Sequence, residues 1–154
     1  MTSGPEQRLA DLGYTLPTVP KPLASYVPAV RDGDQVWTSG QLPTIDGTLV
    51  ATGKVGRDVT PEQAAECARI CGLNALAAVK AEIGDLVNVT GVVKAVVFVA
   101  SDPGFTGQSA VANGLSDLLG QVFGEQGRHA RSAVGVSVLP LDAPVEAEIV
   151  VRVI

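Results

Sequence analysis

Apolar and polar positions alternate most regularly at the end of the chain, from Val145 to Ile154. Successive side chains of a strand point to opposite faces, so this pattern predicts a strand with one apolar face. That face carries Val145, Ala147, Ile149, Val151 and Val153. Glu146 and Glu148 share the opposite face, about 6–7 Å apart along the strand.

Another strand is predicted just before this one, because residues 132–139 are mostly small or β-branched. Arg131 opens it, and the proline-containing stretch 140–144 predicts a turn between the two strands. If the strands are neighbours, the Arg131 guanidinium can approach a carboxylate of Glu146 or Glu148. Two interpretations stay open here: a surface ion pair, or a polar pair that binds a ligand.

The first part of the chain predicts a hairpin. Residues 26–30 and 35–39 are typical of two strands, and Arg31-Asp32-Gly33-Asp34 between them is a turn signal. Trp37, the single tryptophan, is expected in the core. Gly40 follows the second strand and permits either close backbone approach or a bulge. A further short strand is expected at residues 49–51.

Two helices are predicted around a long apolar strand. The first begins at Thr60, with Pro61 at its first position and Gln63 completing a capping box, and it ends at Gly84. The second covers residues 108–123 and has one apolar face. The valine-rich run 89–100 between them predicts a central strand that is covered on both faces.

Together these elements predict an α+β fold: about six strands in one mixed sheet, with both helices on one face. No remaining segment is large enough to cover the second face of the sheet, which predicts an oligomer that buries its sheets together. The prolines of residues 1–25 predict an extended arm, whose Leu16, Val19 and Leu23 lie across the domain or a neighbouring subunit. Residues 26–154 then form a single domain.

Composition narrows the classes of function. The chain has 154 residues, of which 46% are hydrophobic and 18% charged, as in globular proteins. The net charge is −5 and no run of Lys or Arg is present, which argues against nucleic acid as the main ligand. Neither an apolar leader nor a run of membrane-spanning length is present in this sequence, so a cytoplasmic location is expected and no membrane partner.

The candidate chemistry is limited to acid–base and hydrogen-bonding groups. Cys67 and Cys71 share one helical face with alanines, and we expect small buried residues there rather than metal ligands or a disulfide. No glycine pattern fits a phosphate or dinucleotide site, so neither a cofactor nor a metal is predicted. The single histidine, His129, gives no ground for a serine nucleophile and is interpreted as a surface residue. The remaining candidates are Tyr26, Ser39, Asn113, Arg131, Glu146 and Glu148. Arg131 is the strongest, because a guanidinium binds a carboxylate through two parallel hydrogen bonds.

Three ordered blocks resemble the Rid family of reactive intermediate deaminases, also called YjgF-like proteins. The blocks are YVPAV (26–30), TSGQLP (38–43) and ARSAVGVSVLPLDAPVEAEIVV (130–151), of which the last is the most specific. The extended N-terminus and the stretch GRHARSAVG (127–135) suggest a longer branch of that family.

The resemblance implies a chorismate-mutase-like protomer and a homotrimer with ligand clefts between subunits. It also implies cofactor-free hydrolysis of small 2-imino or enamino acids to 2-keto acids and ammonia. Carried onto this chain, Arg131 would hold the substrate carboxylate and Glu146 would activate water. Tyr26, Ser39, Asn113 and Ala133 would line the cleft.

Two positions depart from the well-known deaminases. Ala133 stands where they carry a cysteine, and Gly135 replaces a larger residue, which suggests a wider or differently shaped pocket. One alternative is therefore a protein that binds or senses small carboxylates without efficient catalysis. A second alternative is the endoribonuclease or translation-inhibitor activity attributed to some members, which the acidic charge disfavours.

Overall fold

The computed structural model describes residues 3–19 and 25–154. Its helices are α1 (Pro5–Asp11), α2 (Pro61–Ile83) and α3 (Gln108–Phe123). Its strands are β1 (Ala29–Asp32), β2 (Gln35–Thr38), β3 (Thr44–Ile45), β4 (Thr48–Leu49), β5 (Val89–Ala100), β6 (Ala130–Val136) and β7 (Val145–Val153). Short 3₁₀ helices follow α2 and α3 and precede β7.

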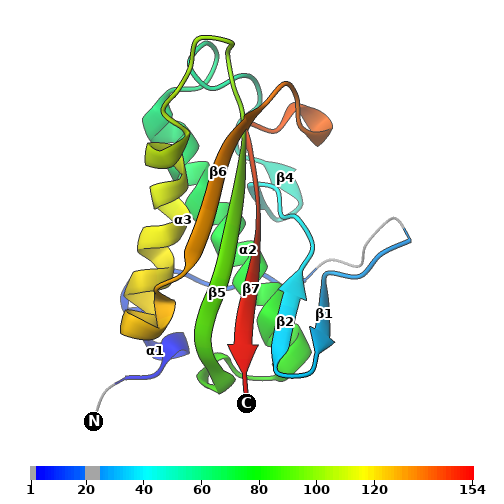
Figure 1. The fold of residues 1–154 in the computed structure, drawn as a ribbon, viewed down its shortest axis with the longest axis vertical. Coiled ribbons are helices and arrows are strands. Elements are labelled where there is room, and N and C mark those ends of the chain that lie inside the picture. Colours follow the sequence, from blue (N-terminus) through cyan, green and yellow to red (C-terminus); the bar gives the residue numbers. More distant parts are fainter. Residues whose placement is uncertain (1–2, 20–24) are drawn as a thin grey trace.

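Five strands form one mixed sheet in the order β1-β2-β7-β5-β6, with α2 and α3 packed on one face (Figure 1). Only β5 and β6 pair in parallel; the other neighbours are antiparallel. The predicted α+β fold with a mixed sheet is therefore confirmed. The expected sixth strand is not part of this sheet, because β4 pairs only with β3 in a separate small hairpin.

The sequence left open whether the last two strands are neighbours in the sheet. β6 and β7 are not neighbours, because β5 lies between them and pairs with both. Across this row Ala95 of β5 stands beside Arg131 of β6 on one side and Ile149 of β7 on the other. β5 is thus the central strand, as expected, and the proposed contact between Arg131 and a carboxylate of β7 does not form within the chain.

Local signals set the ends of α2 where the sequence placed them. The Thr60 hydroxyl accepts the Gln63 backbone N–H at 3.1 Å, and the Gln63 side-chain oxygen accepts the Thr60 N–H at 2.9 Å. Gly84 ends the helix with a positive φ of 90°. Such a capping box satisfies two N–H groups that the first helical turn leaves without a backbone partner.

The core lies between the sheet and the helix pair. α2 and α3 approach closely through glycines: a Cβ added at Gly114 would lie 1.9 Å from the Ala65 carbonyl oxygen, and one at Gly72 would lie 2.5 Å from Leu115. The largest fully buried side chains include Leu76, Leu86, Leu115, Leu118, Leu119 and Ile149. Close packing of this kind fixes the position of α3 relative to β5 and β6.

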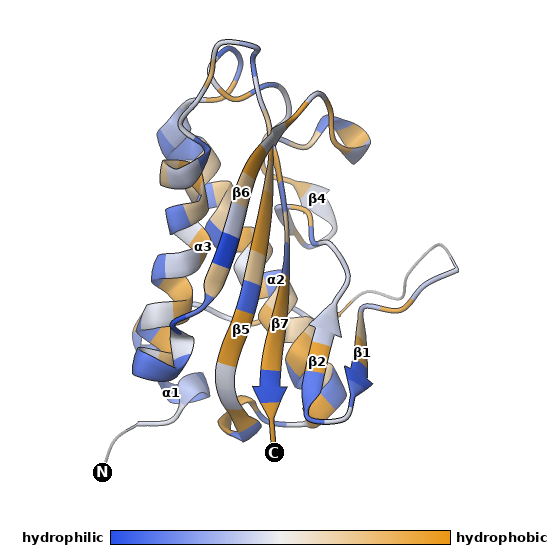
Figure 2. Ribbon diagram, in the orientation of Figure 1, coloured by the Kyte–Doolittle hydropathy of each residue, from blue (hydrophilic) through white to orange (hydrophobic). Residues whose placement is uncertain are grey.

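The second face of the sheet, called the open face below, carries large apolar side chains in contact with solvent. Val30, Trp37 and Val134 are 53%, 51% and 44% exposed. The prediction of a buried Trp37 is wrong, because it alternates with Val36 and Thr38, whose side chains are the buried ones of β2. β5 and β7 are hydrophobic along most of their length (Figure 2), so the open face is suited to burial against another surface.

Residues 3–19 pack against the rest of the chain. Leu9 of α1 is buried, and Tyr14 and Leu16 contact the main core. Arg8 donates a hydrogen bond to the Val122 carbonyl at 2.9 Å, which ties α1 to the end of α3. Val19 lines a cavity beside α2, and Leu23 lies outside the described residues.

Cys67 and Cys71 are both buried in α2, as predicted, and neither forms a disulfide. Burial raises the pKa of the Cys67 thiol to about 11 and that of Cys71 well above its ordinary value. Among the described helices, none combines the length and the hydropathy needed to cross a membrane.

Candidate functional site

Arg131 is held by neutral acceptors of α3. One terminal nitrogen, Nη1, donates to the Asn113 side-chain oxygen at 2.8 Å and to the Ser116 hydroxyl at 3.0 Å. The other, Nη2, donates to the Ser109 carbonyl at 3.3 Å. No salt bridge among the described residues includes Arg131, so its positive charge is oriented without being neutralised.

The donor count shows what this guanidinium still offers. It has five N–H groups, two on each terminal nitrogen and one on Nε. Both donors of Nη1 and one donor of Nη2 are used. Within residues 3–19 and 25–154, Nε–H and the second Nη2–H have no partner, and these two donors are on nitrogens bonded to the same carbon. They match the two oxygens of a carboxylate.

His129 lies beside this arginine, which the sequence did not predict. Its Nε2 is 2.9 Å from the Ser116 hydroxyl oxygen, and its Nδ1 is 2.6 Å from the Gly127 carbonyl oxygen. The arginine cluster is defined here as Asn113, Ser116, His129 and Arg131. Two spacings signal it in the sequence. Asn113 and Ser116 are about one helical turn apart, and His129, directly before β6, is two residues from Arg131, the spacing at which extended residues share one face.

Glu146 lies on the open face beside Glu148, half-buried, as the alternation of β7 predicts. Burial raises the pKa of the Glu146 carboxyl above its ordinary value, and the negative charge of Glu148 adds to that rise. Gly40 faces this side chain closely, since a Cβ there would lie 2.6 Å from Glu146 Oε1. The close approach expected at Gly40 is therefore confirmed, and its partner is this carboxyl group.

Ser39 and Tyr26 belong to the segments next to Gly40. The Ser39 hydroxyl donates to the Val27 carbonyl at 2.5 Å, and its N–H donates to the Pro28 carbonyl at 2.8 Å. These bonds hold the loop before β1, in which Tyr26 is 57% exposed. Ser39 directly precedes Gly40 and therefore lies near Glu146. Tyr26 is connected to this region only through the loop that Ser39 holds.

The two groups of candidate residues lie on opposite faces of the sheet. Arg131 shares the helix-covered face with buried Ala95, whereas Glu146 shares the open face with Phe98. The register places them two strands and three residues apart, a Cα separation of about 14 Å. A three-carbon acid cannot contact both side chains within one chain.

The two departures from the known deaminases have different surroundings. Ala133 lies two residues after Arg131 on the same face and packs against the core. At Gly135, a Cβ would lie 3.0 Å from Gln108 Nε2 and 3.1 Å from Ser101 Oγ. The space that a larger residue would take is therefore filled by two side chains of this chain, so the glycine does not widen the pocket at Arg131.

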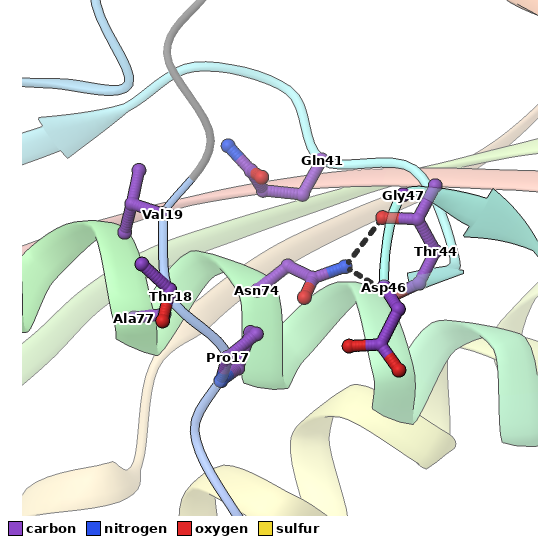
Figure 3. Close-up of a pocket in the computed structure, with 9 residues that line it drawn as sticks. All are labelled: Pro17, Thr18, Val19, Gln41, Thr44, Asp46, Gly47, Asn74 and Ala77. Atoms are coloured by element: carbon purple, nitrogen blue, oxygen red, sulfur yellow. Dashed lines mark hydrogen bonds between the residues drawn. The ribbon is translucent and has the colours of Figure 1, made fainter.

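The described surface has several shallow cavities. One of about 320 Å³ adjoins the arginine cluster and is lined by Ser116, Gly120, Gly127, Arg128, His129 and Arg131. Another, of about 430 Å³, lies between residues 17–19, the β3–β4 hairpin and α2, where Asn74 donates to Thr44 (Figure 3). None of the site residues predicted from the sequence lines the second cavity. No group of three or more potential metal ligands occurs among the described residues.

Comparison with known proteins places these features in a family. Residues 6–150 match the sequence model described as "YjgF/chorismate mutase-like, putative endoribonuclease". Protein TCP17 of Trypanosoma cruzi is 47% identical over 145 residues, covering 94% of this chain and 91% of that protein.

Two solved structures are similar as well. Atu1372 of Agrobacterium tumefaciens, a protein of unknown function, has a TM-score of 0.92 at 46% identity, covering 97% of this chain and 92% of the other. E. coli TdcF, solved with bound serine, has a TM-score of 0.61 at 28% identity, covering 87% and 92% of the two chains.

Proposed function

Because this chain belongs to the YjgF/chorismate-mutase-like family, we propose that it hydrolyses small 2-imino or 2-enamino acids. Water adds to the C=N carbon, the carbon–nitrogen bond breaks, and the products are a 2-keto acid and ammonia. No cofactor takes part, because an imine carbon is already electrophilic and needs mainly positioning and one acid–base group. The proposal assigns the chain to the Rid branch of the family.

One observation carries the proposal: the guanidinium of Arg131 is fixed by neutral acceptors and keeps two donors on adjacent nitrogens. A carboxylate bound there is held in one plane and one orientation. In the proposal, the 2-carboxylate of the substrate accepts hydrogen bonds from these two donors.

Glu146 is the acid–base group of the proposal. Its raised pKa makes the carboxylate a better proton acceptor at neutral pH than that of an exposed glutamate. Because Gly40 has no side chain, the Glu146 carboxyl group fits against this part of the backbone. In the reaction it accepts a proton from the attacking water and returns it to the departing amine. Ser39, Tyr26, Asn113 and Ala133 line the remaining walls of the cleft.

The active site then forms between subunits of a homotrimer. Arg131 of one subunit and Glu146 of the partner subunit face the same small acid, since both cannot do so within one chain. The apolar open face supports this assembly, because side chains such as Val30, Trp37 and Val134 lose water when the sheets pack together. Serine bound to the related TdcF supports a ligand of amino-acid size and charge.

The test is hydrolysis of 2-iminopropionate, generated from alanine by an amino acid oxidase and trapped with semicarbazide. The wild-type protein is expected to reduce the trapped product, whereas Arg131→Ala is expected to lose this effect while keeping its assembly state and its circular dichroism spectrum. Glu146→Gln is expected to lose turnover while it still binds pyruvate.

Full activity of Arg131→Ala would refute the proposal. Pyruvate binding without turnover on 2-iminopropionate or bulkier imines would instead support a carboxylate-binding protein, for which Ala133 in place of the usual cysteine is the motivating feature. RNA cleavage that Arg131→Ala abolishes would favour the endoribonuclease activity named in the family description.

A further inference from the structure

We infer that His129 and Ser116 are positioning residues that hold Arg131 in the orientation needed to bind the substrate carboxylate. The inference rests on the proposed function and adds two residues to it. It starts from a continuous chain of hydrogen bonds: Gly127 carbonyl, His129, Ser116 and Arg131.

The donor and acceptor of each hydrogen bond can be assigned by starting from the Gly127 carbonyl. A carbonyl only accepts, so the proton of this contact is on Nδ1 of His129. In the neutral ring the other nitrogen, Nε2, is then an acceptor, and the Ser116 hydroxyl donates to it. The hydroxyl proton is therefore turned toward the histidine, and the Ser116 oxygen presents lone pairs to Nη1 of Arg131.

The position of the Gly127 carbonyl is fixed by packing. A Cβ at this residue would lie 2.2 Å from the Leu119 carbonyl oxygen, so only glycine allows the turn to lie so close to α3. The turn leads through His129 into β6, and both His129 and Arg131 contact Ser116 of α3. The orientation of the imidazole is thus determined by the backbone and not by the substrate.

This chain decides which donors Arg131 keeps for a ligand. While Asn113 and Ser116 both accept from Nη1, the donors left over are Nε–H and one Nη2–H. If the Ser116 hydroxyl lacks its acceptor on His129, its proton can turn toward the guanidinium and compete with Nη1–H. The guanidinium then loses one of the three hydrogen bonds that fix its plane. Its orientation becomes variable, so its donors are no longer held in place for the substrate carboxylate.

The test is the affinity for pyruvate, a small 2-keto acid, measured by calorimetry on the full-length protein. His129→Leu and Ser116→Ala are each expected to weaken binding about tenfold, the size of one hydrogen bond to a charged group. His129→Gln is expected to recover most of this loss, because its side-chain oxygen can accept the Ser116 hydroxyl. Gln121→Ala, an exposed position of the same helix, serves as the control and is expected to bind as the wild type does.

A double-mutant cycle separates positioning from a general structural role. In an Arg131→Lys background, which removes the guanidinium plane, His129→Leu is expected to change pyruvate affinity less than twofold. An equal tenfold loss in both backgrounds, or wild-type affinity in His129→Leu and Ser116→Ala, would overturn the inference and leave the proposed function standing. Absence of pyruvate binding to the wild type would refute the carboxylate clamp itself, and the inference with it.

Discussion

Two glycines of α3 are expected to respond in opposite directions to the same substitution. Around Gly120 an added Cβ meets no heavy atom within 4 Å, whereas at Gly114 it meets the Ala65 carbonyl oxygen of α2 at 1.9 Å. Replacing glycine by alanine within a helix lowers the entropy lost on folding, which is worth about 0.5–1 kcal/mol. Gly120→Ala should therefore raise the free energy of unfolding by about that amount.

At Gly114 the same gain is opposed by overlap with backbone. To bring the Cβ from 1.9 Å to 3.0 Å, below which real Cβ contacts essentially do not occur, α3 must move at least 1.1 Å (3.0 − 1.9) from α2. Overpacking of a core by one carbon typically costs about 1–3 kcal/mol, and a rigid backbone contact belongs at the upper end. Gly114→Ala should lower the free energy of unfolding by about 2 kcal/mol after the helix gain is subtracted.

Urea unfolding followed by circular dichroism measures both variants, at one protein concentration because assembly of subunits also contributes to stability. The two midpoints should lie on opposite sides of the wild-type midpoint, and the melting temperatures should differ by roughly 5–12 °C. Gly114→Ala should also weaken pyruvate binding, since Asn113 and Ser116 flank it. If Gly114→Ala proved as stable as Gly120→Ala, the close contact between α2 and α3 would not exist in the protein.

Three further predictions concern other parts of the chain. The pKa of Glu146 is raised above its ordinary value of 4.5, so the folded state keeps this proton at pH values where the unfolded state has lost it. The free energy of unfolding therefore falls as the pH rises from 4.5 through the pKa of the folded state. Melting curves between pH 4 and 7 should show Glu146→Gln gaining on the wild type as pH rises, and a constant difference would contradict this. Thr60→Ala removes the cap of α2 and should cost about 1 kcal/mol in urea unfolding, with Thr48→Ala as an exposed threonine control. Both cysteine thiols are buried, and burial raises the pKa of Cys67 to about 11 and that of Cys71 well above its ordinary value. Ellman's reagent should therefore react with the native protein only as it unfolds. Rapid labelling of the native state would exclude this packing.

The sequence predicted best those features that depend on neighbours along the chain. The ends of α2 follow from Thr60, Gln63 and Gly84, which act within one turn of the helix they cap. β7 follows from a strict alternation, which assigned Glu146 and the buried valines to the correct faces. Even Trp37 carried a local signal, because its position between Val36 and Thr38 places it on the open face.

What the sequence did not predict depends on which segments meet across the sheet. Nothing local states that β5 lies between β6 and β7, because that order results from the parallel crossover through α3. For the same reason the sequence could not decide whether Arg131 meets a carboxylate of β7, and its side-chain partners are found on α3. The sequence shows that Asn113 and Ser116 are one helical turn apart and that His129 and Arg131 are two residues apart. Only the packing of α3 on β6 shows that these two pairs meet.

The separation of Arg131 from Glu146 has a consequence for binding. No salt bridge among the described residues includes either side chain, and the two lie on opposite faces of one sheet. If they paired within the chain, each would neutralise the other and neither would hold a ligand strongly. A 2-imino acid carries a negative carboxylate and, when protonated, a positive nitrogen, so it presents the opposite charge to each. In the proposed homotrimer, a site between Arg131 of one subunit and Glu146 of the partner subunit would let the substrate supply the charges that the protein keeps apart.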